Sequence, residues 1–130
     1  MPTDHRDTVE QALATFIAAF NDLDRARMTA CFLDDATVFH PMGSGGYRAI
    51  GFWIDLFDQW RAERPGPPYQ NLQPCDLQIQ QLGDAAAVVT FHLEHHLLTV
   101  GRRTLVLCRT PEGWKIAHLH ASNFPRERPE

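Results

Sequence analysis

The stretch that decides the fold of this chain lies near its end and reads Trp114-Lys115-Ile116-Ala117-His118-Leu119-His120-Ala121-Ser122. We interpret it as the last strand of a sheet, in which side chains alternate between two faces. Regular alternation places on one face Trp114, Ile116, His118, His120 and Ser122. A face that begins apolar and continues with two imidazoles and a hydroxyl indicates a pocket wall. Its apolar part would bind the body of a ligand, and its polar groups would lie near the reacting end.

Helical periodicity dominates the first half of the chain. The first helix is expected to begin at a cap on Thr3 or Asp4 and to end before Asn21. A shorter helix is expected at about 24–33 and a third at about 47–63, with a strand at 36–40 between them. The proline-rich stretch that follows ends the third helix.

The second half of the chain has the pattern of a strand meander. Strands are predicted at about 72–82, 85–98, 103–110 and 114–123. Turn-forming residues separate them at Gly83-Asp84, Gly101 and Pro111-Glu112-Gly113. Helices followed by antiparallel strands predict an α+β fold, in which a curved sheet wraps around one long helix and leaves a cavity between them.

Composition limits the classes of protein to which the chain can belong. Its 130 residues predict a single domain, 1–130, with a loose polar tail at 125–130. A net charge of −4 argues against nucleic acid or a membrane surface as a partner. Three cysteines without a CxxC pair predict a reducing, cytoplasmic location. The polar start after Met1 predicts no signal peptide.

Two phrases of the sequence resemble the nuclear transport factor 2-like superfamily. The run from Asp34 to Gly43 resembles the phrase with which ketosteroid isomerases end their first strand, and His40 stands in the place of their catalytic carboxylate. The run from Gly113 to Ser122 is similar to SnoaL-like strands and to the calcium/calmodulin-dependent kinase II association domain. The resemblance covers about residues 7–124. It implies a cone-shaped fold, in which a long N-terminal helix and two shorter helices pack on a strongly curved, mainly antiparallel sheet that encloses a pocket.

The same resemblance argues against two known mechanisms. Ketosteroid isomerases stabilise an enolate with two hydrogen-bond donors, and the corresponding positions here are Phe16 and Val106, which cannot donate. Related dehydratases use a His–Asp dyad whose aspartate corresponds best to Asn21. The chain is therefore not expected to isomerise steroids.

The resemblance also places the first strand beside the last, which would bring His40 toward His118 and His120. We predict a cofactor-free acid–base enzyme of the lyase, isomerase or cyclase kind, acting on a hydrophobic or carbonyl-containing substrate. His40 would be the base, and His118 or His120 its partner acid. The residues expected to bind this substrate are Phe16, Phe20, Phe57, Val106 and Ser122.

Two alternative functions use the same pocket. The chain could be a non-catalytic module for ligand binding or oligomerisation. It could instead bind a metal ion through His40, His118, His120 and one further ligand.

Two further expectations depend on strand register. If the chain makes a tight turn at Val100-Gly101, the side chains that face the pocket are Phe91, Leu93 and His95. If Gly101 instead forms a bulge, the side chains that face the pocket are His92, Glu94 and His96. The helices can pack on only one face of a single sheet, and the other face must be covered by something else. A homodimer is therefore expected, with its contact on the outer face. Leu105 and Leu107 are the residues predicted at that contact.

Overall fold

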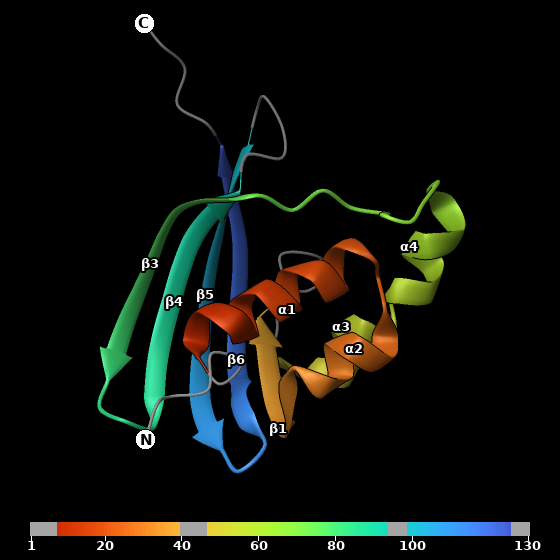
Figure 1. Cartoon of the computed structure of the whole chain (residues 1–130). Coiled ribbons are helices and arrows are strands. Elements are labelled where there is room, and N and C mark those ends of the chain that lie inside the picture. Colours follow the sequence, from red (N-terminus) through yellow and green to blue (C-terminus); the bar gives the residue numbers. More distant parts are fainter. Residues whose placement is uncertain (1–7, 40–46, 94–98, 126–130) are drawn as a thin grey trace, which may run out of the picture.

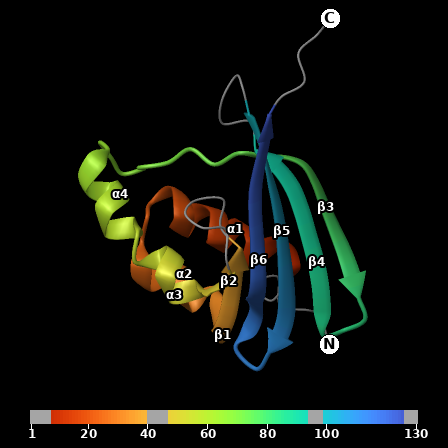
Figure 2. The same ribbon diagram turned by 180° about the vertical axis from the view of Figure 1, so that it is seen from behind.

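One curled sheet with helices on its inner side forms this protein. The structure is a computed structural model that describes residues 8–39, 47–93 and 99–125. The strands follow the order β2-β1-β6-β5-β4-β3 across the sheet, and the helices lie together on one side of it (Figures 1 and 2). The strand bounds are β1 Phe32–Phe39, β2 Tyr47–Ala49, β3 Pro74–Leu82, β4 Ala86–Leu93, β5 Thr99–Thr110 and β6 Gly113–Pro125. This arrangement confirms the predicted α+β cone.

The helices are shorter than the sequence periodicity predicts. They are α1 Val9–Asn21, α2 Arg25–Ala30, α3 Ile50–Ile54 and α4 Phe57–Glu63. The cap of α1 is Thr8, whose hydroxyl accepts a hydrogen bond from the Gln11 amide, so the predicted caps at Thr3 and Asp4 are wrong. The predicted third helix is also wrong, because its range contains strand β2 and two separate helices. Among the described residues, no helix is long and apolar enough to cross a membrane.

Strand pairing confirms that the first long strand lies beside the last. β1 runs parallel to β6, and the remaining neighbours of the sheet are antiparallel. Gly101 lies inside β5, where it pairs with Leu93 and Asn123, so the turn predicted at Gly101 is wrong. The hydrogen-bonded ladder continues through this glycine.

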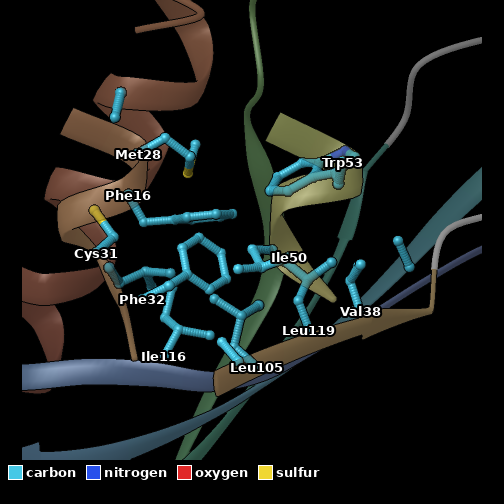
Figure 3. Close-up of a cluster of buried hydrophobic side chains, with 14 of the residues drawn as sticks. Phe16, Met28, Cys31, Phe32, Val38, Ile50, Trp53, Leu105, Ile116 and Leu119 are labelled. Atoms are coloured by element: carbon cyan, nitrogen blue, oxygen red, sulfur yellow. The ribbon is translucent and has the colours of Figure 1, made fainter. Parts of the chain in front are cut away.

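The hydrophobic core lies between α1 and the inner face of the sheet. Side chains from α1, α2, α3 and the sheet converge there (Figure 3). Leu105 and Leu107 are completely buried in it. The prediction that these two leucines lie on the outer face is therefore wrong, because the inner face of β5 carries them.

An extra residue in β6 decides which side chains reach this core. Val106 pairs with His118 while the next residue of β5, Leu107, pairs with Ile116, so Ala117 has no counterpart on β5. Such a bulge sets two residues against one and reverses the alternation beyond it.

The predicted alternation is therefore correct before the bulge and wrong after it. Ile116 and Leu119 both point into the core, at 1% and 2% exposure (Figure 3). His118 and His120 lie on the outer face, and so does Ser122, which pairs with Arg102. The bulge allows every large apolar side chain of β6 before Ser122 to face the helices, so the burial of these side chains stabilises the altered register.

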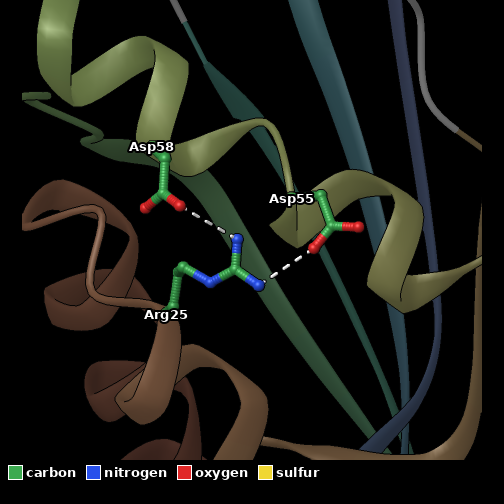
Figure 4. A network of polar contacts seen from close by, with 3 residues as sticks. All are labelled: Arg25, Asp55 and Asp58. Carbon is green, nitrogen blue, oxygen red and sulfur yellow. Dashed lines mark hydrogen bonds and ion pairs between the residues drawn. The ribbon is translucent and has the colours of Figure 1, made fainter.

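Ion pairs at the protein surface connect α2 to the region of α3 and α4. The Arg25 guanidinium lies 2.9 Å from Asp55 Oδ1 and 3.3 Å from Asp58 Oδ2 (Figure 4). Both carboxylates are 69% exposed, and pairs of this kind contribute about 1 kcal/mol or less each. The apolar contacts of these helices therefore hold them in place more than the ion pairs do.

Neighbouring residues of β6 should differ sharply in their contribution to stability. Leu119→Ala removes a buried side chain and should cost about 3 kcal/mol of unfolding free energy. The matched variant His120→Ala changes an exposed side chain and should cost less than about 1 kcal/mol. Urea unfolding of both variants measures the difference. A larger loss for His120→Ala would contradict the altered register.

Candidate functional site: an apolar cavity with one arginine

A cavity lies between α1, α3 and the inner face of the sheet. Its empty volume is about 330 Å³, which includes space that is open to solvent. The residues that line it are Phe16, Phe20, Trp53, Leu72, Phe91, Arg103, Leu119 and Ala121. All of them are apolar except Arg103.

Stacked aromatic rings form the helical wall of this cavity. The ring of Phe20 lies nearly parallel to that of Trp53, with centroids 5.3 Å apart and planes 18° apart. Phe16 continues the stack at 6.3 Å from Phe20. Phe57 is fully buried behind them and meets both Phe20 and Trp53 edge-on. The structure thus places Phe16 and Phe20 at the cavity, as expected, whereas Phe57 supports the wall from behind.

Arg103 enters the cavity from the inner face of β5. Its Nη1 atom donates to the carbonyl oxygens of Arg102 and Ser122, at 2.9 and 3.1 Å, and to Asn123 Oδ1 at 3.4 Å. Burial lowers the pKa of Arg103 to about 10, because the apolar surroundings disfavour its charge. The guanidinium still carries a positive charge at neutral pH.

The end of α1 positions a further part of the wall. The side-chain oxygen of Asn21 accepts a hydrogen bond from the Leu72 amide at 2.6 Å. The backbone oxygen of Asn21 accepts from the amides of Tyr69 and Gln70, at 2.8 and 3.0 Å. These bonds hold the segment between α4 and β3 against α1, so Leu72 lines the cavity. The position that corresponds to the dehydratase aspartate therefore binds the backbone here.

The histidines of β6 form a second cluster on the opposite face of the sheet. The hydroxyl of Thr37 lies 2.8 Å from Nδ1 of His118, and the Phe39 ring lies 5.4 Å from both His118 and His120. Val106 lies beside His118 on this outer face. The expectation that His118, His120, Val106 and Ser122 face the apolar pocket is therefore wrong, because the bulge turns them away from it.

Burial lowers the pKa of His118, and the neighbouring positive charge of His120 lowers it further. A hydrogen bond with Thr37 acts in the opposite direction. His118 is therefore a neutral imidazole at pH 7. His40, the predicted base, lies outside the described residues.

The fourth strand follows neither register in full. Phe91 and Leu93 face the core, as the tight-turn alternative predicts, but no turn lies at Gly101, which pairs with Leu93 inside the ladder. His92 lies 3.3 Å from the Asp76 carboxylate. Glu94, His95 and His96 lie outside the described residues.

A metal ion would need several ligands close together. In the described part of the chain, no three histidine, cysteine, aspartate or glutamate side chains come together as ligands. The alternative of a histidine-bound metal therefore depends on His40.

Sequence reasoning missed Arg103, and the reason is again strand register. The sequence does contain a signal for the bulge, because Trp114 and Ile116 share one parity whereas Leu119 and Ala121 share the other. If the strand contains one extra residue between Ile116 and Leu119, all four side chains lie on the same side of the sheet. That correction places Ala121, and its partner Arg103 on β5, at the cavity.

A curled sheet, one long helix and an apolar cavity between them define the α+β cone class of pocket proteins. The model of the SnoaL-like domain matches residues 9–127, so the chain belongs to the SnoaL-like domain family. No curated protein sequence matches the chain.

Solved structures agree with this class. The S. rosetta CaMKII hub has a TM-score of 0.74 at 21% identity, over 95% of this chain and all of the hub chain (100%). An NTF2-like protein from Cytophaga hutchinsonii has a TM-score of 0.73 at 18% identity, over 94% of this chain and 100% of that chain. A proposed dehydratase of the NTF2-like family from Streptomyces avermitilis has a TM-score of 0.71 at 22% identity, over 92% and 94%. At these identities the likeness concerns the fold.

The titration of His118 should report its surroundings. Its pKa is expected below the usual 6.5, and His120→Ala should raise it by removing a neighbouring charge. The unfolded chain then binds more protons than the folded chain just below pH 6.5. The stability that neutral His118 contributes is therefore present above pH 6.5 and is lost as the pH falls toward the folded-state pKa.

NMR titration of the histidine ring protons measures this pKa. His92→Ala is the control, because His92 lies on β4, away from the pair, and should leave the titration of His118 unchanged. A pKa of His118 at or above 6.5, or one that does not respond to His120→Ala, would contradict the proposed environment.

Proposed function

We propose that this protein binds a small, mostly apolar molecule in the cavity between α1, α3 and the sheet. The observation that carries the proposal is a preformed cavity whose lining is apolar at every position but one. Its aromatic wall is built before any ligand arrives, because Phe20 stacks on Trp53 and Phe57 packs edge-on against both. A preformed site binds without first ordering its side chains.

Ligand binding without turnover is better supported than acid–base catalysis. A general base must come within hydrogen-bonding distance of the proton it removes. Arg103 is the only titratable group among the described residues of the lining, and it keeps its proton at neutral pH. His118 and His120 lie across the sheet from the cavity.

A lyase reaction is the second candidate, and the fold likeness to the proposed dehydratase from Streptomyces avermitilis favours it. It now depends on His40 alone among the three predicted catalytic histidines. A reaction that His40→Ala abolishes and His118→Ala does not would support this candidate.

We propose that a second copy of the chain packs against the outer face of the sheet and forms a homodimer. Half-buried, uncharged side chains gather there on β1 and β5, the two neighbours of β6, namely Thr37, Phe39, Thr104 and Val106. Sedimentation of the protein and of Val106→Glu tests this proposal, because a charge at the contact should produce monomers. A monomeric parent protein would contradict it.

Filling the cavity should abolish binding without unfolding the protein. Ala121 lines the cavity, so Ala121→Leu should occupy part of its volume. Toluene is a suitable probe, and NMR spectra of the Leu72 and Leu119 methyl groups report its binding. We expect shifts in the parent protein and at least a tenfold weaker affinity in the variant.

Ser122→Leu is the matched control for this experiment, because it adds the same side chain one residue later on the outer face. It should bind toluene as the parent does. If toluene shifts neither methyl group in the parent protein, the cavity does not bind apolar molecules and the proposal is wrong.

A further inference from the structure

Two histidines lie at the centre of the outer face that the proposed homodimer covers. β6 is the middle strand of the three at this contact, with β1 on one side and β5 on the other. On β6, His118 pairs with Thr37 of β1 and Val106 of β5, and His120 lies two residues further along on the same face. A contact between the uncharged side chains of β1 and β5 in two copies therefore also covers both imidazoles.

The side chains beside these imidazoles are uncharged. The Thr37 hydroxyl lies 2.8 Å from Nδ1 of His118, and the Phe39 ring lies 5.4 Å from both imidazoles. Burial lowers the pKa of His118 and the charge of His120 lowers it further, while the hydrogen bond with Thr37 raises it. His118 is half-buried in the single chain, whereas His120 is exposed, so a partner would change the surroundings of His120 most.

In the described part of the chain, no carboxylate forms an ion pair with either imidazole. The Asp76 carboxylate lies 3.3 Å from a different histidine, His92 of β4. The helices lie on the other side of the sheet (Figure 2). The charged or titratable residues at neighbouring positions on β1, β2, β5 and β6 are Asp35, Tyr47, Arg102, Cys108 and Lys115.

Two of these neighbours carry their charge away from the histidine pair. Arg102 stacks on the Phe124 ring at 3.7 Å, and the Lys115 ammonium binds the carbonyl oxygen of Ala30 at the end of α2. Asp35 is exposed. A proton on His118 or His120 therefore adds positive charge to this face without an ion pair among the described residues.

Dimerisation removes the imidazoles of both copies from water. A two-fold contact uses the same patch on each copy, so a contact centred on β6 brings the two histidine pairs toward one another. A desolvated imidazole prefers its neutral form, and a positive charge nearby strengthens that preference. A protonated ring in the contact would have to keep its charge with less water and beside other positive rings.

We propose that the dimer through the outer face is sensitive to pH, and that it dissociates when His118 and His120 bind protons. This inference rests on the proposed homodimer, because it names the condition that controls it. Two separate chains bind more protons than the dimer does in the pH range where these rings titrate. The affinity between copies is therefore highest above the usual imidazole pKa of about 6.5 and decreases as the pH falls below it.

The overall charge of the chain acts in the opposite direction. With neutral histidines its net charge is −4, so two copies repel one another at neutral pH. The first protons that bind to histidines bring this charge toward zero, and the general repulsion becomes weaker. Dissociation at low pH would therefore have to come from charges at the contact itself.

Sedimentation equilibrium at two pH values tests the inference. The dissociation constant of the parent dimer should be at least about tenfold higher at about pH 5.5 than at about pH 7.5, because each proton released on association changes it about tenfold per pH unit. Circular dichroism shows whether the chain stays folded at the lower pH. If it does not, the lower measurement is made at about pH 6.

Glutamine variants assign the effect to the histidine pair. The double variant His118→Gln, His120→Gln cannot bind protons at these positions, and glutamine keeps a polar side chain beside Thr37. It should dimerise with the same affinity at both pH values. His92→Gln is the matched control, because it removes a histidine of β4 outside the proposed contact. It should keep the full pH dependence of the parent protein.

A fixed charge checks the same idea without a change of pH. His120→Lys carries a positive charge at both pH values and should weaken the dimer at least about tenfold at about pH 7.5. It decides the question if the double glutamine variant does not dimerise. An unchanged affinity of His120→Lys would overturn the inference.

The other outcomes separate the inference from the proposed homodimer. Equal dissociation constants of the parent protein at the two pH values would overturn the pH dependence and leave the homodimer in place. A pH dependence that persists in the double glutamine variant, or that disappears equally in His92→Gln, would overturn the role of His118 and His120. A parent protein that is monomeric at about pH 7.5 would overturn the homodimer itself, and this inference with it.

Discussion

The single unpaired residue Ala117 determines how this protein divides its side chains between two faces. Without the bulge, the apolar residues at the two ends of β6 would face opposite sides of the sheet, and no helix layer could cover both. With it, Ile116 and Leu119 reach the same core. The cavity, the position of Ala121 at its wall and the outward histidines all follow from this one irregularity.

The two faces of the sheet consequently have different chemistry. The part of the inner face that lines the cavity is apolar apart from Arg103, and the outer face carries His118, His120 and the hydroxyl of Thr37. Arg103 is half-buried at the cavity wall, where the apolar surroundings lower its pKa. The burial of the apolar residues around it stabilises the fold.

Much of the fold could be predicted from the sequence, because helical periodicity and turn residues act locally. The α+β order of elements and the positions of Phe16 and Phe20 at the cavity are found in the structure. The contact of the first long strand with the last was predicted from the family resemblance alone, and the structure shows that the two strands are parallel. The inward arginine was not predicted, since strict alternation was assumed through β6 and a one-residue shift exchanges the faces of every position beyond it. Helix bounds failed for a different reason: the apolar side chains of 47–63 are spaced like one helix, but the chain bends between α3 and α4.

Asn21 holds the segment that carries Leu72 through main-chain groups, so the position of this part of the cavity wall does not depend on the side chains of the segment. Both of its oxygen atoms bind main-chain N–H groups, those of Tyr69, Gln70 and Leu72, so the path of this segment is set by atoms that every residue except proline possesses. The side chain at position 72 can therefore change in size or polarity while its backbone keeps its anchor. Evolution, or a protein engineer, can in this way alter what the cavity admits without rebuilding the scaffold that carries it.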